Sequence, residues 1–308
     1  MSNSILGLHH VTAIAGNAKR NFDFYTKILG LRLVKKTVNF DDPGTYHFYF
    51  ADEIGTPGTI LTFFPWEGIQ QGRIGTGLTT ELAYAVPGSS IEFWNQRFKE
   101  NNVKVTATGR RFDQPYITFQ DPDGLFLTFI EATDPRKPWE TDEVKAPVAT
   151  RGFHSVTLTL RNTDATAKIL TDLLGYRLDG NDNDRTRYVT DAVETASIVD
   201  LIADPQGKPA VNAGGTIHHI AFRVKDEATM MEYRKKISDY GLSITPKIDR
   251  NYFFSLYFRE PGGVLFEIAT DNPGFDVDEP ISELGKNLKL PAQYEGQREL
   301  IEKALPII

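Results

Sequence analysis

The chain has 308 residues, a formal net charge of −7 and a hydrophobic content of 40%. This acidic balance argues against nucleic acid as a partner, because phosphate binding requires a basic surface. No apolar run approaches the roughly 18 residues that span a bilayer, and the first residues lack the features of a signal peptide, so we expect no membrane partner and a cytoplasmic protein. The absence of cysteine excludes disulfides and thiolate ligands, so any metal must be held by His, Asp, Glu or Tyr.

An internal repeat divides the chain into four copies of one βαβββ module. The first two copies form a predicted first half at residues 1–133. For the first copy we expect a strand at 8–14, a helix at 18–29 and strands near 31–38, 45–51 and 59–64. For the second copy we expect a strand at 80–86, a helix over SIEFWNQRFKEN and strands near 103–111, 115–120 and 125–131.

Residues 134–150 are rich in proline and charge and are predicted to link the halves. The second half, residues 151–271, contains the other two copies. The third is expected to have a strand at 153–160, a helix at 164–174 and strands near 176–179, 186–190 and 195–202. The fourth is expected to have a strand at 217–224, a helix at 226–240 and strands near 242–248, 252–259 and 264–269. Residues 272–308 form a tail with a helix that begins at a proline, which we expect to pack on the surface.

Histidine pairs open the first and fourth copies, at His9-His10 and His218-His219. The third copy has His154 followed by Ser155, and the second copy has no histidine there. Side chains alternate between the two faces of a strand. The alternation places His10, Ser155 and His219 on a polar face that lines a cavity, and it places His9, His154 and His218 on the face that packs into the core.

The same alternation gathers further polar side chains into the predicted cavity. Glu267 shares a face with His219, while His47, Tyr49 and Tyr257 come from the third strands of their copies. The first and second copies have threonine where the fourth has Glu267. Asp200 of the third copy is a weaker candidate for an equivalent carboxylate.

Two imidazoles and one carboxylate on one side of an ion would leave several coordination positions free. That is the ligand set of non-haem Fe(II) oxygenases, and zinc could use the same ligands with water. The residues therefore indicate a metal site at His10, His219 and Glu267. They leave the identity of the metal open, and they also allow a polar cluster without a metal.

The strand openings HHVTAI and HHIAFRV and the turns DPDG and EPGGVLFEIATD resemble the vicinal oxygen chelate (glyoxalase and extradiol dioxygenase) superfamily over essentially the whole chain. The segments KKTVNFDDPGTYHFYFAD and YFFSLYFREPGGVLFEIATDNPGF look like the ring-cleaving dioxygenases of the hydroquinone and catechol type. The resemblance implies an α+β fold in which four βαβββ modules form two half-open, cleft-bearing barrels with a helical tail. It also implies Fe(II), with Mn or Zn as alternatives, held by His10, His219 and Glu267, and a tyrosine at Tyr257 that assists an aromatic substrate.

The position of Ser155 sets a condition on this resemblance. Many extradiol enzymes take all three ligands from the second half, whereas here the first ligand must be His10. Module 1 must then pack against module 4, and module 2 against module 3. If each half closed on itself, His10 could not reach Glu267.

The expected function is Fe(II)-dependent cleavage of a hydroquinone- or catechol-like ring, with a small aromatic substrate and O₂ as partners. We expect His47 and Tyr257 to transfer protons, with Tyr49 as a weaker candidate. Arg250 and Asp249 are expected to form an exposed pair near the mouth of the cavity.

One rival function is that of a glyoxalase-like isomerase or lyase, or a thiol transferase, using Zn, Ni or Mn. Another is a metal-free protein that binds aromatic compounds. A homo-oligomer is also possible.

Overall fold

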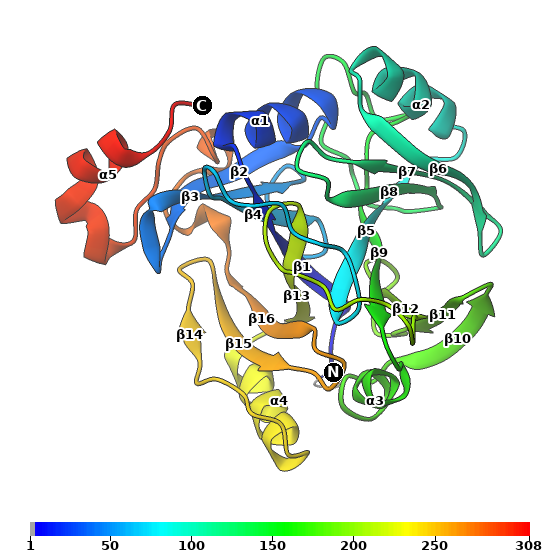
Figure 1. The fold of residues 1–308 in the computed structure, drawn as a ribbon. Helices are drawn as coiled ribbons and strands as arrows, with labels where there is room; N and C mark the ends of the chain where they lie inside the picture. The colour runs from blue at the N-terminus through cyan, green and yellow to red at the C-terminus, as the bar shows by residue number, and fades with distance from the viewer. Residues whose placement is uncertain (1–3) are drawn as a thin grey trace.

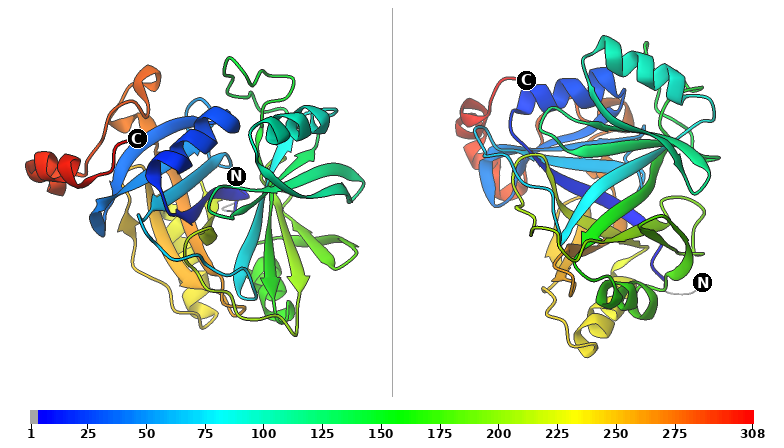
Figure 2. Two further views of the ribbon diagram at one scale, coloured as in Figure 1. Left: turned by 45° about the horizontal axis from the view of Figure 1, so that its top comes forward. Right: turned by 45° about the vertical axis from the view of Figure 1, so that its right-hand side comes forward.

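The computed structural model describes residues 4–308, which form two eight-stranded sheets that lie side by side (Figure 1). Each sheet is curled, and its helices cover the outer face, so the α+β arrangement of two half-open barrels is confirmed. Figure 2 shows the two sheets from two further directions, with the tail against the first sheet. Among the described residues, no helix is long and apolar enough to cross a membrane.

The first sheet combines the first and fourth copies of the repeat, in the order β14-β15-β16-β13-β1-β4-β3-β2. Its strands from the first copy are β1 (Leu8–Ala15), β2 (Arg32–Asn39), β3 (Asp42–Ala51) and β4 (Ile60–Pro65). Those from the fourth are β13 (Thr216–Val224), β14 (Ile248–Asp249), β15 (Phe253–Arg259) and β16 (Leu265–Pro273). The two copies meet where β1 pairs antiparallel with β13.

The second sheet combines the second and third copies in the order β10-β11-β12-β9-β5-β8-β7-β6. Its strands are β5 (Leu78–Val86), β6 (Lys104–Arg111), β7 (Gln114–Gln120) and β8 (Phe126–Glu131), followed by β9 (Gly152–Leu160), β10 (Arg177–Asp182), β11 (Arg185–Val189) and β12 (Ile198–Ala203). The seam between the copies is the antiparallel pair of β5 and β9. Each sheet is therefore built from both halves of the chain.

The helices are α1 (Ala18–Asp23), α2 (Ile91–Glu100), α3 (Asp164–Lys168), α4 (Glu227–Asp239) and α5 (Arg298–Ala304). The expectation of continuous helices at 18–29 and 164–174 was wrong, because π-helical turns at Phe24–Ile28 and Ile169–Leu173 follow α1 and α3. A π turn changes the phase of a helix. It allows consecutive apolar residues, Phe24 with Tyr25 and Ile169 with Leu170, to be buried together.

The segment 242–248 was also predicted incorrectly as a full strand. It contributes one bridge, from Ile244 to Phe258, and the two-residue strand β14. Pro246 lies in this segment, and proline has no N–H to continue a ladder of hydrogen bonds. The segment therefore forms an irregular edge of the first sheet.

The tail runs along the outer edge of β2 and ends in α5 (Figure 1). Short 3₁₀ turns lie at Phe275–Val277, Ile281–Glu283 and Ala292–Gln297. The backbone N–H of Lys289 donates to the carbonyl of Lys36, and the Lys35 ammonium, which is fully buried, pairs with Asp278 and with Glu279 at 2.7 Å. The tail thus covers a strand edge that would otherwise present free backbone groups.

Candidate metal centre and active-site chamber

Three predicted ligands from the first and fourth copies converge on the inner face of the first sheet. Nε2 of His219 lies 2.9 Å from Oε2 of Glu267, and Nε2 of His10 lies 3.3 Å from the same oxygen. The two Nε2 atoms are 3.3 Å apart. All three side chains are buried. The hydrogen-bonded seam of β1 and β13 brings His10, from the start of the chain, to the other two.

The chemistry of this cluster fits a divalent cation. Oε1 of Glu267 accepts a hydrogen bond from Ser255, while its buried Oε2 receives no aligned hydrogen-bond donor. Ligands that sit at right angles around an ion, with bonds of about 2.1 Å, are separated by roughly 3.0 Å, which matches the observed spacing. Burial would raise the pKa of Glu267, but the nearby imidazoles of His10 and His219 hold that pKa well below its usual range.

A β-bulge in each strand positions the ligand imidazoles. The pairing of β1 with β13 passes from Leu8 to His10 and from His219 to Ile217, so His9 and His218 have no partner in the ladder. Such bulges re-aim side chains. As a result, Nδ1 of His9 lies 2.9 Å from Nδ1 of His10, and Nδ1 of His218 lies 2.8 Å from Nδ1 of His219.

The interpretation of His9 and His218 as core histidines was therefore incomplete. Strict alternation would point each away from the residue that follows it, whereas each bulge turns the ring toward that residue. His218 also lines the cavity in front of the cluster. Because one proton is shared across each Nδ1–Nδ1 contact, the pairs can leave Nε2 of His10 and His219 without a proton, as a metal ligand requires. Burial also lowers the pKa of His219, which favours its neutral form.

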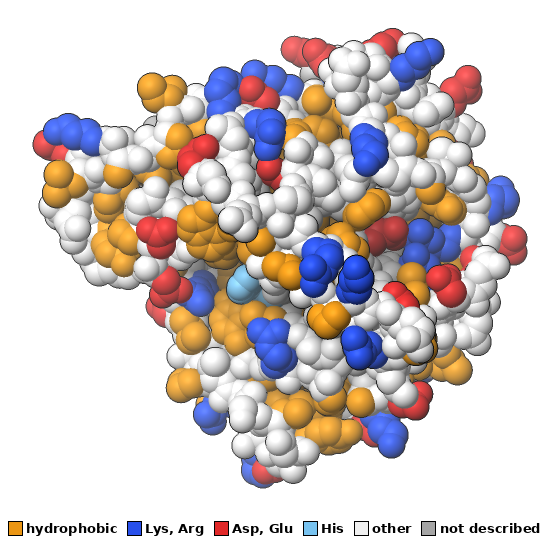
Figure 3. Space-filling view, viewed as in Figure 1, with side chains coloured by type: hydrophobic (Ala, Val, Ile, Leu, Met, Phe, Trp, Pro, Cys, Tyr) orange, Lys and Arg blue, Asp and Glu red, His pale blue; other side chains and the backbone are white. Residues whose placement is uncertain are grey.

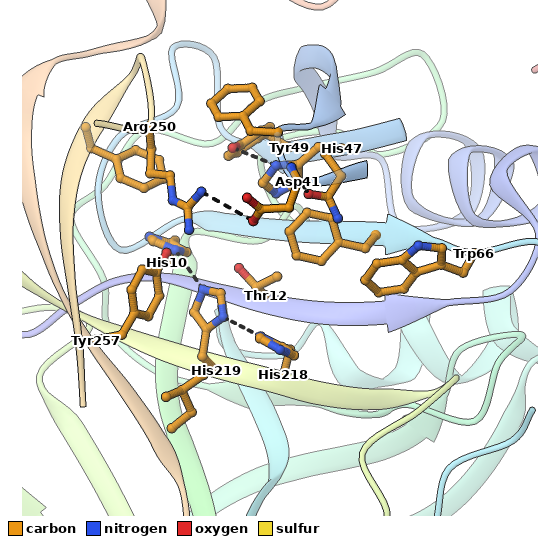
Figure 4. A pocket seen from close by; sticks show the side chains of 15 residues that line it. His10, Thr12, Asp41, His47, Tyr49, Trp66, His218, His219, Arg250 and Tyr257 are labelled. Carbon is orange, nitrogen blue, oxygen red and sulfur yellow. Dashed lines mark hydrogen bonds and ion pairs between the residues drawn. The ribbon is translucent and has the colours of Figure 1, made fainter. Parts of the chain in front are cut away.

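A cavity of about 300 Å³ lies in front of the three ligands (Figure 4). Its walls are mainly aromatic and come from both copies: Phe40, Phe64, Trp66 and Phe253. Its polar groups include Thr12, His47, Tyr257 and Arg250. Flat apolar walls with a few convergent polar groups are typical of a site for a small aromatic ligand.

His47 lies in a chain of hydrogen bonds along one wall of the cavity. Its Nδ1 is 2.9 Å from the hydroxyl of Tyr49, and its Nε2 is 2.9 Å from the hydroxyl of Thr62. Thr62 in turn contacts Thr12 at 2.9 Å. Burial strongly raises the pKa of Tyr49. Burial, together with the neighbouring His10 side chain, strongly lowers the pKa of His47. Tyr49 therefore stays protonated and His47 stays neutral, with one ring nitrogen of His47 as a donor and the other as an acceptor.

Tyr257 and Arg250 form the opposite side of the cavity (Figure 4). The Tyr257 ring packs edge-on against His219, with 5.5 Å between centroids, and the guanidinium of Arg250 lies 5.5 Å from the centre of the Tyr257 ring. Burial raises the pKa of the Tyr257 hydroxyl. The expected pair of Arg250 with Asp249 is wrong, because Arg250 approaches Asp41 of the facing β2–β3 hairpin, at 3.8 Å.

The second sheet has ion pairs at the position that corresponds to the metal cluster. By register, Glu81 and Ser155 correspond to His219 and His10. The guanidinium of Arg111 binds Glu81 at 2.5 Å, and that of Arg187 binds Asp200 at 2.9 Å. Asp200, the weaker carboxylate candidate, therefore lies in the second sheet, where the guanidinium of Arg187 balances its charge.

Comparisons with known proteins agree with this geometry. The family model described as "Glyoxalase/Bleomycin resistance protein/Dioxygenase superfamily" matches residues 7–129 and 152–268. A Bacillus subtilis (strain 168) protein named as a ring-cleaving dioxygenase, MhqO, is 45% identical over 99% of this chain and 97% of its own length. The chlorohydroquinone/hydroquinone 1,2-dioxygenase of Sphingobium indicum is 34% identical over 98% and 97%. A crystal structure described as a dioxygenase from B. subtilis subsp. subtilis str. 168 has a TM-score of 0.96 and 44% identity, and covers 100% of this chain and 98% of its own.

Proposed function

Because the chain belongs to the glyoxalase/bleomycin resistance protein/dioxygenase superfamily, we propose that it is a ring-cleaving dioxygenase that acts on hydroquinone- or catechol-like aromatics with O₂. The observation that carries the proposal is the buried cluster of His10, His219 and Glu267 at the base of an aromatic cavity. Relatives over the full length of the chain that bear the names of ring-cleaving dioxygenases support it.

In this proposal His10, His219 and Glu267 hold Fe(II) through two neutral nitrogens and one carboxylate oxygen. The ion would supply a centre that acidifies a bound phenol and brings the ring and O₂ together. The walls formed by Phe64, Trp66 and Phe253 hold the ring and exclude water from the reacting atoms. Mn and Zn are compatible with the same ligand atoms.

His47 is proposed to accept the proton of the substrate hydroxyl. Both of its ring nitrogens already have partners, so the proton would arrive through the hydroxyls of Thr12 and Thr62, which connect the cavity to Nε2. This requires the tautomer in which Nδ1 of His47 carries the ring proton and donates to the hydroxyl oxygen of Tyr49, so that Tyr49 orients the ring and Nε2 is free to take up the proton. This arrangement places the proton acceptor beside the cavity and keeps it out of the metal's ligand set.

Tyr257 is proposed to donate a hydrogen bond to the reacting oxygen. Its raised pKa keeps the hydroxyl protonated, and its ring position against His219 holds it next to the proposed metal. The cation of Arg250 beside it favours negative charge that develops on the substrate. General acid assistance of this kind is worth roughly 10²–10⁴ in rate.

The glyoxalase-like alternative has no specific observation in its favour. A second carboxylate would be expected at the position of Thr62, which instead bonds to Thr12 and His47. A metal-free binding protein has no specific observation in its favour either, because the spacing of the two imidazole nitrogens and the carboxylate oxygen matches that of ligands around an ion.

The replacement Glu267→Gln tests the proposal, because it keeps the shape of the side chain and removes its charge. We expect the variant, after anaerobic incubation with Fe(II), to retain far less iron and to lose O₂ uptake with hydroquinone by at least about 100-fold. Glu53→Gln, at an exposed ion pair with Lys137, is the matched control and should behave as the wild type. Unchanged iron content and turnover in Glu267→Gln would overturn the assignment.

A further inference from the structure

A second groove, of about 660 Å³, lies next to the cavity that faces the metal cluster. Its walls are formed mainly by four segments, which include loops and the ends of helices and strands: 76–78, 161–165, 209–212 and 261–265. His218 and Leu265 line both the groove and the cavity. The two spaces are therefore neighbours that share a wall.

The groove has a cationic lining in a protein of net charge −7. Arg161 and Arg259 are its charged lining residues, and no Asp or Glu lines it. Arg259 donates to the carbonyl of Gly263 at 2.6 Å, and Arg161 donates to that of Gly207 at 3.4 Å. Among residues 4–308, neither guanidinium forms an ion pair with a carboxylate, so each retains N–H groups for an anion. Figure 3 shows Lys and Arg side chains gathered on this face, beside the opening in which a histidine is visible.

The donor groups of the groove favour a carboxylate over a general counterion. Arginine binds carboxylates through two parallel N–H groups. Asn162, which follows Arg161 in the lining, accepts the N–H of Asp164 with its side-chain oxygen, so its amide N–H groups remain as further donors. Arg161 follows β9 of the second sheet and Arg259 is the last residue of β15 in the first sheet, so an anion held by both would bridge the two sheets.

The proposed reaction creates a carboxylate next to this groove. Cleavage of the bond between a hydroxylated ring carbon and its unsubstituted neighbour places one oxygen atom of O₂ on each carbon. O₂ is reduced by four electrons, and the two carbons are oxidised to a carboxylic acid and an aldehyde. The acid releases its proton at neutral pH, so a neutral phenol becomes an anionic product.

We propose that the groove is a carboxylate-binding extension of the active site, in which Arg161 and Arg259 hold a carboxylate attached to the ring or to the ring-opened product. This inference rests on the proposed function. A carboxylate could come from two sources, either a substituent that the substrate already carries or the acid that ring cleavage forms. Both sources present the same group to the same two guanidiniums.

Equilibrium binding under anaerobic conditions tests the inference without turnover. The probes are cis,cis-muconate as a ring-opened dicarboxylate, 2,5-dihydroxybenzoate as a carboxylated ring, and hydroquinone as a neutral ring, each measured by calorimetry. In the double variant Arg161→Gln/Arg259→Gln we expect the affinity for a carboxylated probe to fall about ten-fold. The loss is modest because each partly exposed arginine contributes only a weak ion pair. Hydroquinone should bind as before. Arg110→Gln is the matched control, because Arg110 is exposed, donates to a backbone carbonyl and lies on β6.

The outcomes distinguish the two sources. A loss confined to muconate identifies the product as the ligand, and a loss confined to dihydroxybenzoate identifies a carboxylated substrate. In the wild type, added salt should weaken the binding of the affected probe. Unchanged affinity for both carboxylates, or an equal loss for hydroquinone, would overturn the inference. The proposed function fails separately, if the wild type with Fe(II) consumes no O₂ with hydroquinone.

Discussion

The two ligand imidazoles each depend on the histidine that precedes them in the sequence. Nδ1 of His9 and of His218 takes the place that a carboxylate or a backbone carbonyl occupies in many metal sites. The His9 ring also packs against Phe253, with 5.2 Å between ring centroids. The paired histidines thus form two units in which one ring faces the metal position and the other orients it.

Replacing His9 or His218 with Phe should weaken metal binding while leaving all three ligands in place. Loss of such an orienting partner typically costs 10–100-fold in metal affinity. His154→Phe is the matched control, because His154 occupies the same bulge in the second sheet and contacts Ser155 at 3.0 Å. Competition with a chromophoric chelator measures the affinities. Equal metal affinity in His9→Phe, His218→Phe and the wild type would contradict the role.

A single buried carboxyl predicts a pH dependence of stability. Burial raises the pKa of Asp121 from its ordinary value of 3.8 to about 7, although it accepts the hydroxyl of Tyr25. Between these two values the folded state keeps a proton that the unfolded state has released, so this group's contribution to stability falls as pH rises. We expect the wild type to lose on the order of 1–4 kcal/mol relative to Asp121→Asn between pH 4 and pH 8.

Urea unfolding of both proteins at several pH values measures this difference, and the comparison cancels the contributions of the buried histidines. Asp226→Asn is a control of opposite sign, because hydrogen bonds from Thr229 lower the pKa of Asp226. Its contribution is lost only as pH falls below the ordinary value of 3.8, so the profile of this control is extended below pH 4. Parallel pH profiles for the wild type and Asp121→Asn would refute the raised pKa.

At the scale of elements, alternation along the strands predicted which side chains share a face, and the repeat predicted the order of strands and helices. Glu267 and His219 could be placed together in this way because β13 and β16 are regular neighbours. The bulges at His9 and His218 could not be predicted, since one extra residue in a ladder has no signature in side-chain type. The π turns after α1 and α3 escaped prediction for the same reason: they change the phase of a helix without changing its composition.

The contacts of the tail could not be predicted either, because nothing in the local sequence identifies the partner of Lys35. The contact between Arg250 and Asp41 could not be predicted for the same reason. These residues come from the fourth and first copies, which are joined by the pairing of β1 with β13. Sequence placed the predicted site residues on the correct strands. It also predicted that His10 would meet His219 and Glu267 across the seam, but it gave no information on other contacts between the copies, such as that of Arg250 with Asp41.

The buried contact between β2 and the tail should be essential for stability. In Lys35→Met the carboxylate of Glu279, which is 3% exposed, would remain buried without its partner at 2.7 Å. Breaking a buried pair in this way costs about 3–5 kcal/mol. Lys286→Met, on the same tail, removes an exposed pair with Glu283 and should cost at most about 1 kcal/mol. Chemical denaturation measures both values, and similar stabilities for the two variants would show that the tail is not held by Lys35.

At the scale of the whole molecule, the exchanged pairing explains why one metal cluster forms. The first sheet contains both histidine pairs and Glu267, whereas the corresponding face of the second sheet is filled by Arg111 and Arg187 with their carboxylates. Because β13 contacts β5, the two sheets also pack on each other. The metal cluster therefore requires strands from both halves of the chain, and neither half contains a complete set of ligands.

This dependence predicts how separated halves should behave. Expressed alone, residues 1–150 would carry only His10, and residues 151–308 only His219 and Glu267, and each would expose the strand edges that pair in the intact chain. Unpaired edges promote aggregation, so we expect each half alone to aggregate and to bind metal weakly. Co-expressed halves should assemble into a one-to-one complex that binds Fe(II) with the affinity of the intact chain. A full chain cleaved at a protease site placed within 134–150 should stay together as the same complex and bind Fe(II) with the same affinity. Gel filtration and metal titration of the four samples test this. Metal affinity equal to that of the intact chain in residues 151–308 alone would show that the metal cluster does not need His10.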